Sequence, residues 1–263
     1  MPGKGVALIT GASAGIGAAY AASLAARGYD LVLVARDRLR LEAASVVLRE
    51  SAGVAVEVLA ADLAHPADLQ RVEDRLLRND ISVLVNNAGI AVPGRMVDMP
   101  RDRLDAMLLL NVLAATRLAR AVAPGFVARG RGDIINVGSV VGLNADRPGI
   151  SAAYTASKAY LLALSEGLQS ELGRSGVRVQ AVLPGMTRTE IWGKANIDIE
   201  ALARDQLMGA DQVVEAALTG LELGERVTIP SLPDVADWLS FKAAREALRP
   251  NLSRSEPADR FRR

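Results

Sequence analysis

Short apolar runs alternate along the chain with longer segments in which apolar residues recur at helical spacing. The runs are nearly continuous, which is typical of parallel strands covered on both faces. They predict strands at residues 6–10, 31–35, 54–59, 82–85, 133–137, 177–183 and 227–229. Helices are predicted between them at residues 16–27, 38–50, 66–78, 101–123, 152–172 and 210–221. This alternation indicates an α/β fold with a doubly wound parallel sheet between two layers of helices.

No repeat or linker-like segment divides the chain, so we predict one domain over residues 1–263. Residues 230–249 are less regular, and their middle predicts a final helix. Residues 186–209 follow a strand at the sheet edge where a ligand should bind, and they mix apolar residues such as Trp192 with charged ones such as Lys194. We expect this segment to cover the cleft as a lid, with Trp192 touching the substrate. Packing on the core or on a partner subunit is the alternative.

The amino-acid composition limits which kinds of functional site the chain can have. The chain has 31 basic and 30 acidic residues, no cysteine and one histidine, His65. This charge balance gives no reason to expect a nucleic-acid or membrane-surface partner. Thiolate metal sites, disulfides and histidine triads are excluded, so we expect no metal, and proton chemistry falls to Tyr, Lys, Asp or Glu. We see no targeting segment and no stretch of membrane-span length, and expect a cytoplasmic location.

A glycine-rich turn separates the first predicted strand from the first predicted helix, with Gly11, Gly15 and Gly17 in it. Phosphate binding needs a turn without side-chain bulk, so that backbone N–H groups can approach a pyrophosphate. The N-terminus of the following helix adds a favourable dipole. The spacing departs from the common G-x-G-x-x-G pattern, and a tight turn without a ligand stays open as an alternative.

The end of the second predicted strand bears on cofactor choice. In dinucleotide-binding folds an acidic residue there binds the adenosine ribose. Here Ala35 ends the strand and Arg36 follows, so the guanidinium can pair with a 2′-phosphate, and Ser13 adds a hydroxyl from the glycine turn. This favours NADP(H) and leaves NAD(H) possible. Asp37 would serve as the acid if the strand ended two residues later, and an ordinary surface arginine is the other alternative.

Tyr154 and Lys158 lie four residues apart on a predicted helix, so both project from one face. A free tyrosine has a pKa of about 10, too high for efficient acid–base work near neutrality. An ammonium one turn away favours the phenolate, as does an oxidised nicotinamide, and we therefore expect a lowered pKa for Tyr154.

Other polar residues follow predicted strands. Ser139 comes after strand 133–137, and Asn86 comes after strand 82–85. In an open α/β sheet ligands bind outside the carboxyl ends of the strands, so the Ser139 hydroxyl is placed to bond a substrate carbonyl oxygen. Ser151 is the weaker alternative, because it follows no strand. Asn111 lies inside a predicted helix and is a poor helix former, so it is either exposed or has a specific role.

Several motifs occur together in one order along the chain. They are Thr10-Gly11-x-x-x-Gly15-x-Gly17, Asn86-Asn87-Ala88-Gly89, Asn111, Ser139, Tyr154-x-x-x-Lys158 and Pro184-Gly185-x-x-x-Thr189. Over roughly residues 5–190 this pattern resembles the short-chain dehydrogenase/reductase family, in its single-domain branch. The resemblance implies a Rossmann-type fold of about seven parallel strands, and a homotetramer or homodimer.

The resemblance also implies roles. Tyr154 would exchange the proton, Ser139 would orient the carbonyl, Lys158 would hold the nicotinamide ribose and Asn111 would support a water-linked proton relay. Asp62 would contact the adenine, and Thr189 would lie near the carboxamide. The implied cofactor-binding residues are Gly11, Ser13, Gly15, Ile16, Gly17, Arg36, Asp62, Leu63, Asn86, Ala88, Gly89, Tyr154, Lys158, Pro184, Gly185, Thr187 and Thr189. The segment between Ser139 and Tyr154 is about two residues longer than is usual in the family.

We therefore expect an NADP(H)-dependent reductase of ketones or 3-oxoacyl-type carbonyls, or a dehydrogenase of secondary alcohols, with Ser139, Tyr154 and Trp192 facing a bulky or apolar substrate. The alternative from another class is a non-catalytic protein that senses NADP(H) with the same fold. The set Asn111, Ser139, Tyr154 and Lys158 argues for the enzyme, since a binding module has no need of all four.

Overall fold

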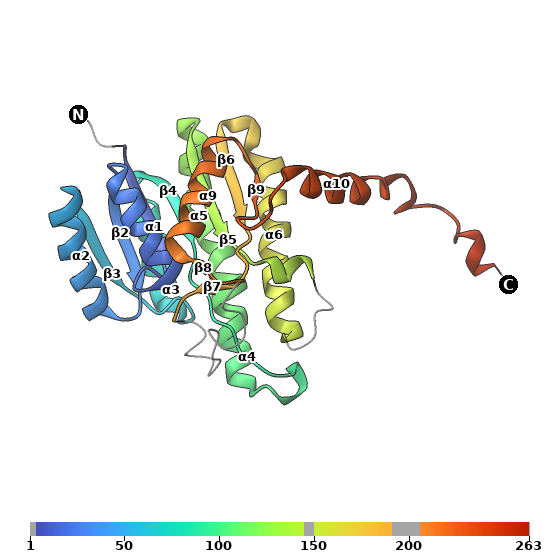
Figure 1. Ribbon diagram of the computed structural model, residues 1–263, viewed down its shortest axis with the longest axis horizontal. Coiled ribbons are helices and arrows are strands. Elements are labelled where there is room, and N and C mark those ends of the chain that lie inside the picture. Colours follow the sequence, from blue (N-terminus) through green and yellow to red (C-terminus); the bar gives the residue numbers. More distant parts are fainter. Residues whose placement is uncertain (1–3, 145–149, 191–205, 263) are drawn as a thin grey trace. The chain divides into compact units, whose positions relative to one another are not determined.

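The computed structural model describes residues 4–144, 150–190 and 206–262. A parallel sheet runs through its centre with the strand order β3-β2-β1-β4-β5-β6-β9 (Figure 1). The strands are β1 (Val6–Thr10), β2 (Asp30–Ala35), β3 (Val56–Ala60), β4 (Ile81–Asn86), β5 (Gly132–Val137), β6 (Val177–Val182) and β9 (Val227–Thr228). The doubly wound sheet of seven parallel strands is thus confirmed. The strand order reverses between β1 and β4, which is where ligands bind in open sheets of this kind.

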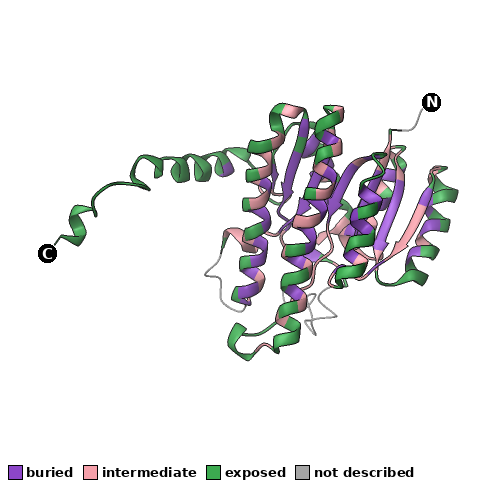
Figure 2. Ribbon diagram, turned by 180° about the vertical axis from the view of Figure 1, so that it is seen from behind, coloured by how far each residue is buried: buried purple, intermediate pink, exposed green. Residues whose placement is uncertain are grey.

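Two layers of helices cover the sheet. One core cluster joins the sheet to α1 (Gly15–Ala26), α2 (Arg38–Ala52) and α9 (Ala210–Glu222). A second cluster joins the other face to α3 (Pro66–Leu76), α5 (Ala115–Arg129) and α6 (Ala152–Leu172). Most strands are buried, the edge strand β3 is half-buried, and the outer faces of the helices are exposed (Figure 2). This is the three-layer arrangement that the nearly continuous apolar strands predict.

One helix is longer than expected. α4 (Arg101–Leu108), a π-helical turn η2 (Leu109–Ala114) and α5 follow one another without a break, and α5 continues past Pro124 to Arg129. The prediction ended this helix at residue 123, before the proline. The helix continues because Phe126, beyond the proline, is fully buried in the core.

Residues Arg101–Arg129 are also long and apolar enough to cross a membrane by length and composition, so the expectation that no stretch reaches that length is wrong. Buried residues on this helix, such as Leu118 and Phe126, pack on the sheet.

The ends of the predicted lid meet each other. β7 (Thr187–Arg188) pairs in parallel with β8 (Met208–Gly209), and the Met208 N–H donates to the Met186 carbonyl at 3.0 Å. Residues 191–205, and with them Trp192, lie outside the described residues. The lid therefore stays a prediction.

The chain divides into two compact units, Met1–Pro230 and Ser231–Arg263. The first holds the whole sheet and both helix layers. The second holds the expected final helix, α10 (Val235–Glu246), which Asp234 caps by accepting a hydrogen bond from Ala236 N at 2.8 Å. A single domain over residues 1–263 stays a prediction. Short 3-10 turns are η1 (Met96–Asp98), η3 (Val140–Leu143), η4 (Gly173–Ser175), η6 (Arg249–Asn251) and η7 (Asp259–Phe261).

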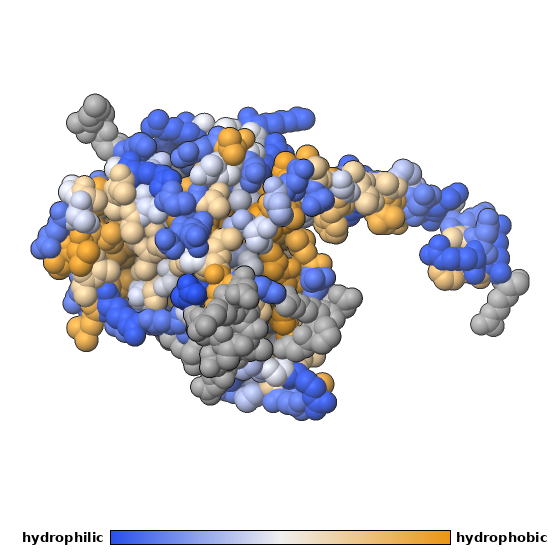
Figure 3. Space-filling model, in the orientation of Figure 1, coloured by the Kyte–Doolittle hydropathy of each residue, from blue (hydrophilic) through white to orange (hydrophobic). Residues whose placement is uncertain are grey.

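Apolar side chains on the outer side of α2 stay exposed (Figure 3). Leu39 is 78% and Val47 is 62% exposed. α2 covers β2 and β3 with the opposite face, through Leu41 and Leu48. α2 begins at Arg38, after Arg36 and Asp37, which follow the end of β2.

Candidate active site

The glycine turn packs too closely for side chains. Gly11 and Gly15 have positive φ angles of 68° and 56°. A Cβ on Gly17 would lie 2.2 Å from the Gly11 carbonyl oxygen, and a Cβ on Gly11 would lie 2.7 Å from Asn87 Nδ2. α1 begins at Gly15, so its free N–H groups open onto this turn. Ser13 and Ile16 are half-buried here. The turn has the form that a pyrophosphate needs.

A clamp holds the turn against the end of β4. The Thr10 hydroxyl donates to the Val85 carbonyl at 3.2 Å and accepts from the backbone N–H groups of Asn87 and Ala88 at 2.9 and 3.0 Å. Asn87 Nδ2 donates back to the Thr10 carbonyl at 2.9 Å. In the sequence Thr10 and Asn87 are recognised only as members of motifs, and this clamp is not predicted. The sequence does place a polar residue at the end of each of these two strands. The strand order makes β1 and β4 neighbours, which brings the two residues together.

Asn86 has its side chain inside the protein. Its Nδ2 donates to the Ala115 carbonyl at 3.2 Å and to Asn136 Oδ1 at 3.0 Å, and Asn136 Nδ2 donates to Ser165 Oγ at 2.9 Å. These groups are buried and tie β4 and β5 to α5 and α6. The side chain of Asn86 thus braces the sheet, while its neighbours Asn87, Ala88 and Gly89 form the exit from β4.

β2, beside which the sequence predicts that the adenosine binds, ends at the residue expected from the sequence. β2 stops at Ala35, and Asp37 caps α2 by accepting from Arg40 N at 3.1 Å. The Asp37 carboxylate is therefore engaged at the helix start. Arg36 is exposed and makes no hydrogen bond or ion pair with the residues that the structure describes. Asp62, after β3, accepts from Ala64 N at 3.0 Å. Leu63 beside it is buried.

Tyr154 and Lys158 share one face of α6, as the spacing predicts. Lys158 Nζ lies 5.9 Å from the centroid of the Tyr154 ring and donates to the Val137 carbonyl, at the end of β5, at 3.1 Å. Burial lowers the pKa of Lys158 to about 8 and raises the pKa of Tyr154 to about 12. The expected lowering of the Tyr154 pKa is wrong for the chain alone. Removing the phenolate from water outweighs the ammonium at this distance.

Asn111 is buried, and both the oxygen and the nitrogen of its side-chain amide form hydrogen bonds. Its Oδ1 accepts from Ile90 N, and its Nδ2 donates to the Ile90 carbonyl, both at 2.9 Å. Nδ2 also donates to Ser157 Oγ at 3.2 Å. Of the two alternatives for this mid-helix asparagine, the structure shows a specific role. It sits in the π-helical turn η2, the kind of irregularity that is frequent at functional sites.

Gly89 lies where Asn111 and Lys158 meet. A Cβ on it would lie 3.2 Å from Asn111 Oδ1 and 3.6 Å from Lys158 Nζ. The end of β4, the π-helical turn and α6 therefore converge at this point. Ser157, on α6, completes the junction by donating to the Tyr154 carbonyl at 2.7 Å. Ser157 is a positioning residue that the sequence analysis missed, because nothing along the chain shows that it touches Asn111.

Ser139 follows β5 as predicted. Its hydroxyl accepts from Val141 N at 3.3 Å and donates to the Pro184 carbonyl at 3.4 Å. Val140 N donates to the same carbonyl at 3.0 Å. The long contact to Pro184 and the partial exposure of Ser139 leave the hydroxyl able to turn toward a substrate. Ser151 is buried before α6, and its hydroxyl has no partner among the described residues.

The segment after β6 lies over the glycine turn. Thr187 Oγ1 donates to the Gly185 carbonyl at 3.1 Å. The methyl carbon of Thr189 lies 3.0 Å from the position of a Cβ on Gly15. The predicted phosphate turn and the predicted Pro184–Thr189 motif are therefore in contact, although they lie far apart in the sequence.

Comparisons with known proteins identify the family of this chain. A family model described as short chain dehydrogenase matches residues 5–200. A solved short-chain dehydrogenase from Sphingobium yanoikuyae, in complex with NADPH, is 50% identical with a TM-score of 0.94, over 98% of this chain and 100% of that one. A bulky-bulky ketone specific alcohol dehydrogenase from Comamonas testosteroni is 42% identical with a TM-score of 0.89, over 98% and 99%.

A curated relative of this chain is also named as a reductase. The very-long-chain 3-oxoacyl-CoA reductase of Anas platyrhynchos is 35% identical over 196 residues, which are 72% of this chain. The match spans 62% of the length of that reductase.

Proposed function

The chain belongs to the short-chain dehydrogenase family, and on that premise we propose that it is an NADP(H)-dependent oxidoreductase that interconverts bulky or apolar ketones and secondary alcohols. The observation that carries the proposal is the convergence of Asn111, Tyr154 and Lys158 where β4, η2 and α6 meet. Ser139 lies at the end of β5, the strand whose Val137 carbonyl holds Lys158. These are the residues to which the resemblance in sequence assigns the catalytic roles.

The residues present fit a dinucleotide. Any side chain on Gly11 or Gly17 would fill the turn, so the backbone N–H groups at the start of α1 stay open to a pyrophosphate. Arg36, without an ion pair among the described residues, stands where a 2′-phosphate would be recognised. The NADPH complex of the Sphingobium relative supports this cofactor. When bound, the cofactor supplies or accepts the hydride, and the protein supplies alignment and the proton.

Tyr154 carries the proton. Its phenol is neutral near pH 7, the form that can donate to a carbonyl oxygen, and burial in the chain alone makes it a weaker acid by raising its pKa to about 12. In reduction the carbonyl oxygen would gain the Tyr154 proton. Lys158, with a pKa of about 8, is largely protonated at pH 7 and stabilises the phenolate that remains. Ser139 donates a second hydrogen bond to the same oxygen, which favours the charge that develops there.

The substrate class rests on the named relatives. One acts on bulky ketones and one on 3-oxoacyl-CoA, and both names describe a carbonyl flanked by large groups. We extend this to the present chain as a bulky or apolar ketone. Trp192 is our candidate for the substrate wall, and it lies outside the described residues.

Turnover separates this proposal from a non-catalytic NADP(H)-sensing protein. Purified protein is mixed with NADPH and a panel of carbonyls, from acetone-sized ketones to diaryl and long-chain ones, and the loss of NADPH absorbance is followed. We expect turnover that rises with substrate bulk. Tyr154→Phe should lose activity by about a hundred- to ten-thousand-fold and still bind NADPH, because only the hydroxyl is removed. Tight NADPH binding with no turnover on any carbonyl would favour the sensor instead.

A further inference from the structure

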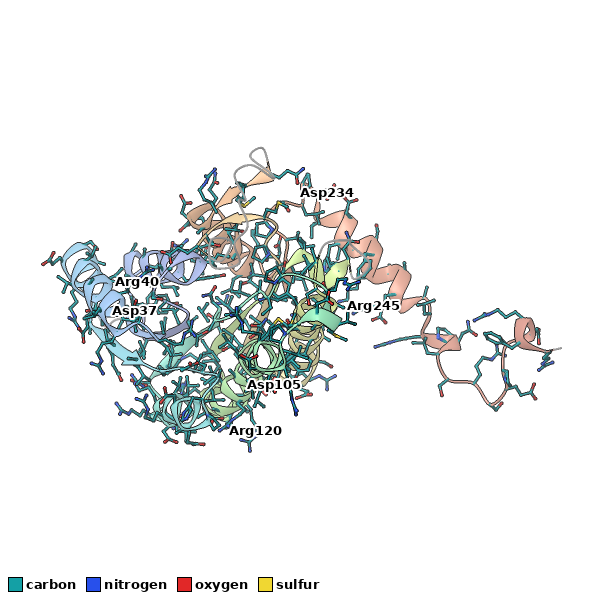
Figure 4. The ribbon with its side chains drawn as sticks, turned by 90° about the horizontal axis from the view of Figure 1, so that it is seen from below. Asp37, Arg40, Asp105, Arg120, Asp234 and Arg245 are labelled. Atoms are coloured by element: carbon teal, nitrogen blue, oxygen red, sulfur yellow. The ribbon has the colours of Figure 1, made fainter. Side chains whose placement is uncertain are left out.

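An ion pair joins the first turn of α2 to the residue that follows Thr189. Arg40 Nη1 lies 2.9 and 2.7 Å from the two carboxylate oxygens of Glu190, which is 150 residues away in sequence. Arg40 Nε also lies 3.4 Å from Asp37 Oδ2. Asp37 and Arg40 come from the first turn of α2 (Figure 4). The side chains of Arg40 and Glu190 are each about half exposed, at 50% and 49%.

The position of this pair connects both ends of the site. Arg40 lies in the first turn of α2, four residues after Arg36, the residue that we assign to the adenosine end. Glu190 follows Thr189, which touches the glycine turn at Gly15. The carboxylate of Glu190 is thus held beside the turn by a guanidinium that belongs to the adenosine end.

We propose that Arg40 is a second ligand of the 2′-phosphate of NADP(H), and that Glu190 is the internal anion which the phosphate displaces from it. This inference rests on the proposed function. A guanidinium presents the same planar fork to a carboxylate and to a phosphate. A phosphate monoester carries about 1.5 to 2 negative charges near pH 7, against one on the carboxylate. An exposed ion pair contributes little free energy, so the exchange costs little.

Arg40 differs from its neighbour Arg38 in where its partner lies, because Glu190 follows the segment beside the glycine turn. Arg38 is paired with Glu42 on the same helix at 3.2 Å. Asp37 Oδ1 accepts the helix-cap hydrogen bond from Arg40 N. After the exchange, Arg36 and Arg40 would flank the phosphate together. Glu190 in turn opposes cofactor binding through Arg40, and opposes NADPH more than NADH.

The test measures equilibrium binding of NADPH and NADH to the full-length chain by fluorescence, without substrate. Arg40→Ala should weaken NADPH binding by about tenfold or more and leave NADH binding within about twofold. Glu190→Gln should tighten NADPH binding several-fold. In the Arg40→Ala background, Glu190→Gln should have no effect, because its influence passes through Arg40. The matched controls are Arg38→Ala and Glu42→Gln, which break the neighbouring pair and should leave the NADPH-to-NADH ratio unchanged.

Three results would overturn the inference. Glu190→Gln could weaken both cofactors and lower the melting temperature, which would make the pair a clamp of the fold. Arg40→Ala could weaken both cofactors equally. Additive effects in the double variant would show that the two residues act independently. Each of these leaves the proposed oxidoreductase standing, whereas a wild-type chain that binds neither cofactor would remove both proposals.

Discussion

Asn111 Nδ2 donates a hydrogen bond to Ser157 Oγ at 3.2 Å, and Ser157 Oγ donates to the Tyr154 carbonyl at 2.7 Å. Ser157 is 1% exposed. One hydroxyl thus links the π-helical turn to the backbone of the residue that we propose as the proton donor.

Ser157→Ala should therefore lower kcat by about tenfold, because the turn that carries Tyr154 loses one buried hydrogen bond of roughly 1–3 kcal/mol. The KM for NADPH should stay nearly constant. Ser157→Thr keeps the hydroxyl and should recover much of the activity. Steady-state kinetics with a bulky ketone checks this. A loss in melting temperature with an unchanged kcat would reduce Ser157 to a packing role.

The buried Lys158 predicts a pH dependence of stability. Its pKa is about 8 in the folded chain, against an ordinary value of 10.5. Between these values the unfolded chain binds more protons than the folded one, so the free energy of unfolding rises with pH, by at most about 1.4 kcal/mol per unit. Below pH 8 the charged form is buried in full, and Lys158→Met should be the more stable chain.

Urea unfolding of wild type and Lys158→Met at several pH values measures this difference. The advantage of the variant should shrink as the pH rises from about 8 to 10.5. Tyr154 titrates in both chains, so its opposite contribution above pH 10 largely cancels. A difference that does not vary with pH would contradict the buried ammonium.

Arg36 should determine cofactor preference. Arg36→Ala should weaken NADPH binding by about ten- to a hundred-fold, since a charge-assisted contact contributes roughly 1.5–3 kcal/mol, and NADH binding should change little. Arg36→Lys keeps the charge but loses the planar guanidinium, so its affinity for NADPH should lie between those of wild type and Arg36→Ala. Binding titrations with both cofactors decide the matter. Equal losses for NADPH and NADH, or a wild-type preference for NADH, would refute the assignment.

Gly17 should tolerate no side chain. A Cβ there meets the Gly11 carbonyl oxygen at 2.2 Å, a backbone atom held in place by the Asn87 clamp. Gly17→Ala should destabilise the chain by about 1–3 kcal/mol and abolish cofactor binding, because the turn must open. Thermal unfolding and NADPH titration measure both effects.

Gly167 in α6 is the matched control for that substitution. A Cβ on it meets nothing within 4 Å. Gly167→Ala should stabilise the chain by up to about 1 kcal/mol, through helix propensity alone, and leave cofactor binding unchanged. Similar behaviour of the two alanine variants would mean that the tight approach at Gly17 is relieved elsewhere.

Much of the fold is encoded locally. Apolar runs predicted every strand of the large sheet, since a parallel strand buried on both faces must be apolar along its whole length. The end of β2 at Ala35 and the placement of Ser139 after β5 also follow from the chain. Helix spacing alone brought Tyr154 and Lys158 to one face, because residues four apart lie one turn apart.

Other features depended on contacts between distant segments. Asn86 and Asn87 are adjacent, yet one braces the core and the other clamps the glycine turn, because successive residues at a strand end point in different directions. The helix runs through Pro124 because Phe126 is buried beyond it. The contact of Arg40 with Glu190 crosses 150 residues.

The pKa of Tyr154 shows most clearly the difference between what the sequence predicts and what tertiary packing produces. Tyr154 and Lys158 are set one turn apart by the sequence, and that spacing predicts attraction between ammonium and phenolate. The shift has the opposite direction because burial disfavours the phenolate. Burial is produced by residues such as Met107 and Val92, which pack beside Tyr154 only after the chain has folded. The sequence by itself determined which groups carry the chemistry, and tertiary packing decided their protonation, because desolvation depends on neighbours that no local pattern specifies.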